Sequence, residues 1–214
     1  MSYVPSPAGF WKRYVAYFVD VLLLSTVLNV LMGAVLSLVG MGQSLRGMFV
    51  EAAEVASPEA WLLAHWHWFA WITAGSVLAY AVLAAVYFIW LEASPRQATF
   101  GKQLAGIRVT ALDGGPPTRG QVVGRFFASG LGWLTLNLGH ALAAWTPQRR
   151  ALHDYLAGTR VENVDPANTA MPMWGWIVIA VNVLALVATV VLTVAIAWFI
   201  VTQLPSLPEF DLRH

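Results

Sequence analysis

Four long apolar stretches decide what this chain can fold into. They cover about residues 14–39, 61–91, 126–145 and 174–201. A helix that crosses a bilayer needs about 20 mostly apolar residues, and each stretch reaches that length. Membrane-spanning strands are only about ten residues long and alternate apolar with polar side chains, which is not the pattern here. The sequence therefore predicts an all-α integral membrane protein, a helix bundle of four membrane-embedded segments.

The composition excludes the other broad classes of protein. Charged residues make up 11% of the chain and hydrophobic residues 58%, whereas about a quarter of the residues in a soluble domain are charged. The absence of cysteine rules out disulfides, thiolate catalysis and iron–sulfur clusters. The net charge of +1 suggests no nucleic-acid partner. No catalytic, metal-binding or dinucleotide motif is present, so we expect neither an enzyme nor a cofactor.

The first apolar stretch is expected to remain as an uncleaved helix. A secretory signal peptide also places basic residues such as Lys12 and Arg13 before an apolar run. This run is too long for a signal peptide, and it contains Asp20.

The positions of the basic residues predict the topology. Cytoplasmic loops carry an excess of Lys and Arg, which places the N-terminus and residues 92–125 inside and the acidic loop 40–60 outside. If the third stretch spans, eight of the 12 basic residues are inside, and if it enters and returns, ten are inside. A break at Asn137 supplies a turn, although 20 residues also suffice to span. We favour the re-entrant form and keep the spanning form open.

Short elements are predicted between the apolar stretches. Phe100, Leu104 and Ile107 recur at helical spacing, which indicates a short amphipathic helix at the headgroups. Residues 107–110 and 159–161 alternate as strands do, and residues 113–117 read as a turn. A second short helix is expected to begin at Thr146 and Pro147 and to end at Gly158. If both strands are cytoplasmic they can pair in a small two-stranded element.

Asp20 is the most informative polar residue in the apolar stretches. It lies seven residues after Arg13, on nearly the same helix face and about 10 Å further along the axis. A charge near the bilayer centre costs about 2.5–3.5 kcal/mol, so Asp20 must face protein or water. Tyr17 is placed to donate to it. One hypothesis is a proton or cation site, and the other is a structural pair in which Asp20 meets Arg13 or Arg125 and pins the helices.

Other polar and small residues are candidates for supporting roles. Asp154 follows His153 on the second short helix, where a local pair with Arg150 is the structural alternative to a second ion site. Glu92 is expected to be a solvated interface charge. Small residues at four-residue spacing predict close helix packing, within the chain or between copies: Gly75, Ala79, Ala185, Thr189, Thr193 and Ala197.

Three segments resemble the RDD family of bacterial membrane proteins, which is named for one Arg and two Asp residues. They are residues 8–20 (AGFWKRYVAYFVD), 99–109 (TFGKQLAGIRV) and 151–161 (ALHDYLAGTRV). Their order and spacing agree with the family. Carried over, the named residues are Arg13, Asp20 and Asp154. The resemblance implies a plasma-membrane protein, with cation/proton exchange among the activities proposed for the family. The fourth apolar stretch lies outside the matched region.

These observations define the expected organisation and two functional hypotheses. Residues 1–161 form an RDD-like membrane domain, 162–173 a linker, 174–203 an additional transmembrane helix and 204–214 a tail. The first hypothesis is a homo-oligomeric secondary transporter of the bacterial inner membrane that exchanges a monovalent cation and a proton. Its ion site would use Arg13, Asp20 and Asp154, with a supporting set of Tyr17, Arg125, Asn137 and His153. The alternative is a non-transporting scaffold or assembly factor in which these residues lock helices.

Overall fold

The computed structural model of the chain describes residues 4–38, 40, 43, 46–47, 50, 58–134 and 138–203. The chain divides into two compact units, residues 1–170 and 171–214. The first contains every element up to β2, and the second contains helix α8 (Met173–Gln203).

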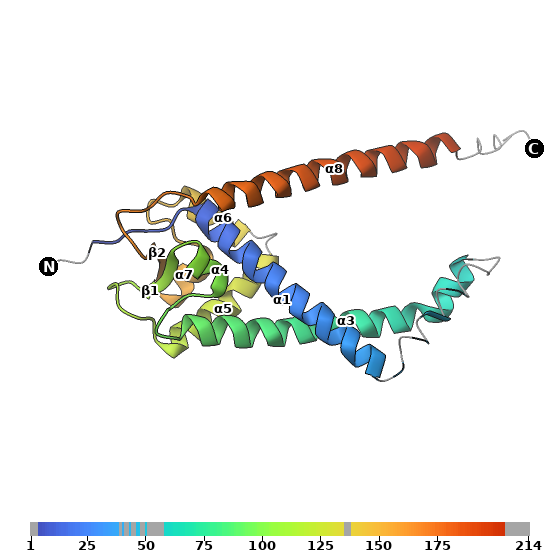
Figure 1. Cartoon of the computed structure of the whole chain (residues 1–214), viewed down its shortest axis with the longest axis horizontal. Coiled ribbons are helices and arrows are strands. Elements are labelled where there is room, and N and C mark those ends of the chain that lie inside the picture. The colour runs from blue at the N-terminus through green and yellow to red at the C-terminus, as the bar shows by residue number, and fades with distance from the viewer. Residues whose placement is uncertain are drawn as a thin grey trace, which may run out of the picture. The chain divides into compact units, whose positions relative to one another are not determined.

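Three helices are long and apolar enough to cross a membrane. They are α1 (Phe10–Leu38), α3 (Pro58–Glu92) and α8 (Figure 1), and their candidate spans are Phe10–Leu38, Ala60–Glu92 and Met173–Thr202. The first, second and fourth apolar stretches are therefore confirmed as helices, with bounds within a few residues of those expected. The side chains that α1 buries are in its first half, at Lys12, Val15, Ala16, Asp20 and Leu24.

The third apolar stretch is divided between two shorter helices. Helix α5 (Arg119–Leu134) and helix α6 (Leu138–Trp145) have 16 and 8 residues, so neither reaches the length of a spanning helix. Both contact the short helix α7 (Leu152–Ala157). A Cβ atom on Gly139 of α6 would lie 3.2 Å from Leu152 Cβ and 3.7 Å from Gly132 Cα of α5. A fourth span is therefore not confirmed.

A small head domain gathers at the N-terminal end of α1 (Figure 1). It consists of α4 (Phe100–Leu104), β1 (Ile107–Ala111), α7 and β2 (Thr159–Asn163). The two strands pair antiparallel, with Val109 opposite Val161, which confirms both predicted strands. The chain before α1 joins the other edge of β2, where the Ala8 N–H donates to the Val161 carbonyl at 2.9 Å. We call these four elements the head.

The head contains an internal repeat. Residues 104–109 read LAGIRV and residues 156–161 read LAGTRV. In each copy a short helix ends at a glycine with a left-handed backbone, at φ +66° for Gly106 and +62° for Gly158, and a strand follows. Glycine adopts this conformation without the steric cost that a Cβ atom brings. Because Val109 faces Val161, the two copies are related by an approximate two-fold axis through this pair.

Two predicted boundaries are wrong for local reasons. Ile107 belongs to β1 rather than to the amphipathic helix, because the left-handed turn at Gly106 ends α4. Helix α7 begins at Leu152 rather than at Thr146 and Pro147. The Thr146 hydroxyl accepts a hydrogen bond from the Arg150 N–H at 3.0 Å, within the connection that precedes α7. The predicted end at Gly158 is confirmed.

Candidate functional site: a buried network of charged residues

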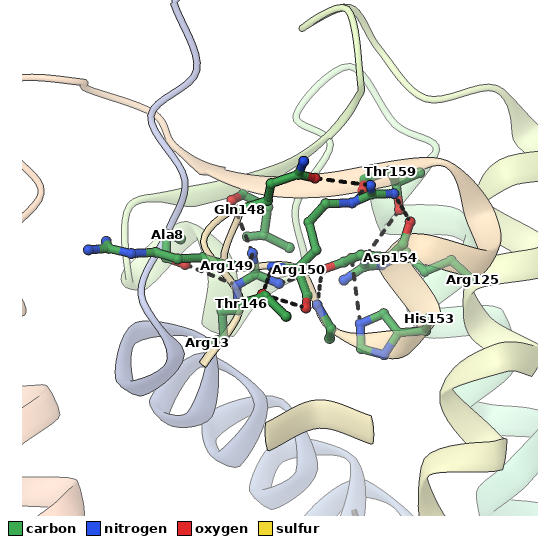
Figure 2. Close-up of polar contacts among 12 residues, drawn as sticks. Ala8, Arg13, Arg125, Thr146, Gln148, Arg149, Arg150, His153, Asp154 and Thr159 are labelled. Atoms are coloured by element: carbon green, nitrogen blue, oxygen red, sulfur yellow. Dashed lines mark hydrogen bonds and ion pairs between the residues drawn. The ribbon is translucent and has the colours of Figure 1, made fainter. Parts of the chain in front are cut away.

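Asp154 is the centre of a buried ion-pair network. Its side chain is fully buried, and its carboxylate contacts Arg13 at 2.5 Å and Arg125 through its second oxygen (Figure 2). The Ala151 N–H donates to the same carboxylate at 3.0 Å, which fixes the first turn of α7. Charge-assisted hydrogen bonds of this kind are about twice as strong as neutral ones. Asp154 therefore ties α7 to α1 and α5.

Arg13 also connects three backbone segments. Besides its pair with Asp154, its guanidinium donates to the carbonyls of Ala8, Arg149 and Val161. These carbonyls belong to the chain before α1, the connection between α6 and α7, and β2. A planar guanidinium with five donors suits several acceptors at once. Arg13 therefore holds the start of α1 against the head.

The network continues from Arg125 to the end of α3. The Nε atom of Arg125 lies 3.2 Å from a carboxylate oxygen of Glu92, and the other oxygen of Glu92 pairs with Lys102 of α4. Burial lowers the pKa of Lys102, and the Glu92 carboxylate opposes that shift. Glu92 is only 4% exposed, so the expectation of a solvated interface charge is wrong. The cations from α4 and α5 offset the cost of burying this carboxylate.

Asp20 lies in a separate set of hydrogen bonds beneath α4. Its carboxylate is fully buried and accepts from the Tyr87 hydroxyl at 2.6 Å, the Thr99 hydroxyl at 2.5 Å and the Gly101 N–H at 2.7 Å. Tyr87 comes from α3, and Thr99 is the N-cap of α4. The contact is close because Gly101 has no side chain, and a Cβ atom there would lie 2.0 Å from the Ala16 carbonyl oxygen.

The expected pairing of Asp20 with Arg13 or Arg125 is wrong. Both arginines bind Asp154 instead. The tyrosine that donates to Asp20 is Tyr87 rather than Tyr17, whose ring lies 6.4 Å from Phe88 and 6.1 Å from His140 between centroids. Two residues on one face of a helix pair with each other only if no other element offers a nearer partner. Here Asp154 of α7 is the nearer partner of Arg13, and Thr99 and Gly101 are nearer partners of Asp20.

The local pair between Arg150 and the Asp154 side chain is also wrong. Arg150 donates instead to the backbone carbonyl of Asp154 at 2.8 Å and to the Thr159 carbonyl at 3.1 Å (Figure 2). Its guanidinium stacks on the Tyr155 ring, 4.1 Å from the ring centroid. Arg150 therefore closes the helix-to-strand connection at the end of α7.

His153 is neutral beside this network. Burial, together with the Arg125 guanidinium, holds the pKa of His153 well below its usual range. Its Nε2 atom lies 3.6 Å from Asp154 (Figure 2), so this contact does not add an ion pair at neutral pH. The ring packs against His140 of α6 with 4.7 Å between centroids. His153 therefore contributes mainly packing between α6 and α7.

Four residues in the ion-pair network around Asp154 and in the hydrogen bonds to Asp20 were not singled out as functional from the sequence: Tyr87, Glu92, Thr99 and Lys102. The repeat in the head offered a signal for the pairing of β1 with β2. For Thr99 the available signal was its position as an N-cap directly before Phe100. Nothing local in the sequence links Tyr87 or Glu92 to residues in the other helices.

The remaining predicted residues lie elsewhere. Asn137 lies outside the described residues. A Cβ atom on Gly75 would meet nothing within 4 Å among the described residues. On α8 the hydroxyl of Thr189 bonds the Ala185 carbonyl and that of Thr193 bonds the Thr189 carbonyl, both at 2.8 Å. Like Ala79 and Ala197, these residues stay candidates for helix packing between copies, and the homo-oligomer stays a prediction.

The ion-pair network around Asp154 and the hydrogen bonds to Asp20 together balance in charge, and they join α1, α3, α4, α5 and α7. Three cations face three anions: Arg13, Lys102 and Arg125 against Asp20, Glu92 and Asp154. Removing one member of a buried pair typically costs about 3–5 kcal/mol. The arrangement is suited to holding helices in fixed positions.

Comparison with known proteins identifies the family of this chain. The RDD family profile matches residues 7–158. The Bacillus subtilis (strain 168) protein described as "Uncharacterized protein YxaI" is 30% identical over 158 residues, which cover 72% of this chain and 96% of the relative. No solved structure gives a significant match. Helix α8 lies beyond the matched region. The chain belongs to the RDD family.

Proposed function

We propose that this protein is a membrane scaffold in which the Arg and Asp residues of the family motif lock a cytoplasmic head onto membrane-embedded helices. One observation carries the proposal: both motif carboxylates are fully buried and already hold their hydrogen-bond donors. Asp154 is held by two arginines and a backbone N–H, and Asp20 by two hydroxyls and a backbone N–H. Neither has an exposed face at which an ion can exchange.

Ion exchange at Asp20 would require these donors to be given up. A cation bound to the carboxylate would displace hydrogens that point at it, including the Gly101 N–H. A buried donor without an acceptor costs about 1–3 kcal/mol, and three such donors surround Asp20. This cost supports a structural role over an exchange cycle.

The position of Asp20 along α1 also supports a structural role. Residues 21–38 of α1 are free of charge, and at 1.5 Å per residue they extend for roughly 27 Å. That length is close to the hydrocarbon thickness of about 30 Å. Asp20 then lies near the membrane boundary rather than deep in the hydrocarbon, and the buried charge needs no transport role to be tolerated.

The same head supports a re-entrant third segment. Strands β1 and β2 flank the α5–α6 region in sequence and pair in one sheet, so both lie on the same side of any membrane. In a four-span protein the two strands would lie on opposite sides. By the positive-inside rule that shared side is the cytoplasm, and the N-terminus lies on the same side. The partner of this protein is then the bilayer itself.

Cysteine labelling tests this topology in a chain that has no native thiol. We expect Gln148→Cys and Leu112→Cys to resist a membrane-impermeant maleimide in intact cells and to react in inverted vesicles. Both side chains are exposed on connections to the head. Arg46→Cys, on the loop predicted outside, should show the opposite pattern. Labelling of the Gln148→Cys and Arg46→Cys proteins from the same side would contradict the re-entrant arrangement.

A flux assay separates the scaffold from cation/proton exchange. We expect wild-type protein in proteoliposomes to show no cation flux driven by a pH gradient. Asp20→Asn should lower the melting temperature, because the amide has one acceptor oxygen where three donors converge, at a cost of about 1–3 kcal/mol. Asp113→Asn is the control, because Asp113 is exposed and accepts from the Gly115 N–H. Wild-type flux that Asp20→Asn abolishes without loss of stability would establish exchange instead.

A further inference from the structure

One face of the two-stranded sheet carries polar side chains that take no part in the ion-pair network around Asp154 or in the hydrogen bonds to Asp20. In the β1–β2 register, Arg108 is opposite Glu162 and Thr110 is opposite Arg160, so these four side chains share one face. The other face carries Val109 and Val161, which are at most 1% exposed and belong to the core. The polar face is therefore distinct from the network around Asp154.

Three buried polar atoms on this face lack hydrogen-bond partners within the described part of the chain. They are Arg108 Nε, Arg160 Nε and Thr110 Oγ1, and Thr110 is fully buried. Buried polar groups almost always have a partner, and exceptions call for an explanation such as an unseen ion. All three atoms are able to donate a hydrogen bond, so the missing group is an acceptor.

The repeat places the two arginines symmetrically. Arg108 and Arg160 occupy the same position in LAGIRV and LAGTRV and lie on either side of the Val109–Val161 pair. Diagonal neighbours of this kind have Cα atoms roughly 7–8 Å apart, a separation that two long side chains can close around one small ligand. Thr110 lies directly opposite Arg160 and two residues after Arg108, so it is a neighbour of both arginines on this face.

The charge of the face favours an anion. Among the described residues, Arg160 has one carboxylate nearby, Glu162 at 3.8 Å. Arg150 also acts on Arg160 electrostatically, and its own donors bind the backbone carbonyls of Asp154 and Thr159. Two arginines, Arg108 and Arg160, with one carboxylate, Glu162, leave this face with a net positive charge.

We infer that this face binds a phosphate group between Arg108 and Arg160, with Thr110 as the third donor. A phosphate presents more than two acceptor oxygens in a tetrahedral arrangement, whereas a carboxylate presents two in a plane. Guanidinium groups are well matched to phosphate. The phosphate can come from an anionic lipid headgroup or from a free phosphate compound, because the chemistry of recognition is the same.

Binding is tested with the full chain in a neutral detergent, with two probes. Inorganic phosphate is compared with chloride at equal ionic strength, and dioleoylphosphatidylglycerol in mixed micelles is compared with dioleoylglycerol, which lacks phosphate. Affinity is measured by equilibrium dialysis for phosphate and by the concentration dependence of the melting temperature for both probes. Binding of inorganic phosphate identifies a free phosphate compound, and binding of the lipid alone identifies a headgroup.

Three variants and one control make the result specific. Arg108→Gln and Arg160→Gln should each weaken binding by at least about tenfold, the loss of one charge-assisted pair. Arg96→Gln removes the same charge from an exposed site and should bind like the wild type. Thr110→Val should weaken binding while raising the melting temperature without ligand, because it removes a buried hydroxyl that has no partner among the described residues.

The Thr110→Val variant keeps the test decisive if an arginine variant fails to fold. The inference is overturned if neither probe binds the wild-type protein. It is also overturned if the three variants bind with wild-type affinity, or if Arg96→Gln weakens binding as much as they do.

Discussion

Replacing Asp154 with asparagine is expected to lower the melting temperature by roughly 10 °C, from a loss of about 3–5 kcal/mol. The wild-type carboxylate is fully buried between Arg13 and Arg125. Arg125 keeps a second carboxylate, Glu92, when Asp154 is neutralised. Arg13 keeps only backbone carbonyls among the described residues, so it carries most of the uncompensated charge. The measurement is thermal unfolding of the purified chain in one detergent.

A double-mutant cycle shows whether the loss arises from the Arg13–Asp154 pair. Arg13→Gln combined with Asp154→Asn should cost clearly less than the two single changes added together, because each single change leaves the other charge unpaired. Asp165→Asn is the matched control. Asp165 is exposed and accepts one hydrogen bond from the Ala167 N–H, so the change should be nearly neutral. Additive losses of stability, or an Asp154→Asn protein as stable as the wild type, would show that the Arg13–Asp154 pair does not hold the head to α1.

The long helices were predictable because their signal is local. A bilayer fixes the length of an apolar run, so α1, α3 and α8 can be read from composition over about 20 residues. The strands β1 and β2 were also predictable from a local signal, the alternation of residues 107–110 and 159–161. The division of the third apolar stretch into α5 and α6 was harder to predict, because its length also suits a single membrane-spanning helix. The evidence against such a helix is the pairing of β1 with β2, which lie on either side of this stretch in the sequence.

The partners of the motif residues were not predictable in the same way. Asp20 receives hydrogen bonds from residues 67, 79 and 81 positions away, and Arg13 pairs with a residue 141 positions away. Helical periodicity relates residues only along one helix, so it suggested Arg13 and Tyr17 as partners of Asp20. A single sequence does not state which helices meet, and the correct partners depend on that.

Gly101→Ala is expected to separate α4 from α1 and to destabilise the head by about 3 kcal/mol or more. The new Cβ atom would lie 2.0 Å from the Ala16 carbonyl oxygen and 2.9 Å from Asp20 Cγ. Backbone atoms cannot move aside as a flexible side chain can, so α4 must withdraw by roughly 1 Å or more to reach a normal contact distance. That movement stretches the hydrogen bonds that Asp20 accepts from Thr99 and from the Gly101 N–H.

Gly75→Ala provides the matched control for this substitution, because a Cβ atom there meets nothing within 4 Å. In an exposed helix interior, alanine should instead stabilise the chain by up to about 1 kcal/mol. Thermal unfolding of both variants, with limited proteolysis to report opening of the head, distinguishes close packing from helix propensity. If Gly101→Ala melts with the wild type, or if both variants lose stability equally, α4 does not depend on contact with α1. If only Gly101→Ala loses stability, the close approach of Gly101 to the Ala16 backbone is what holds the Asp20 hydrogen bonds in place.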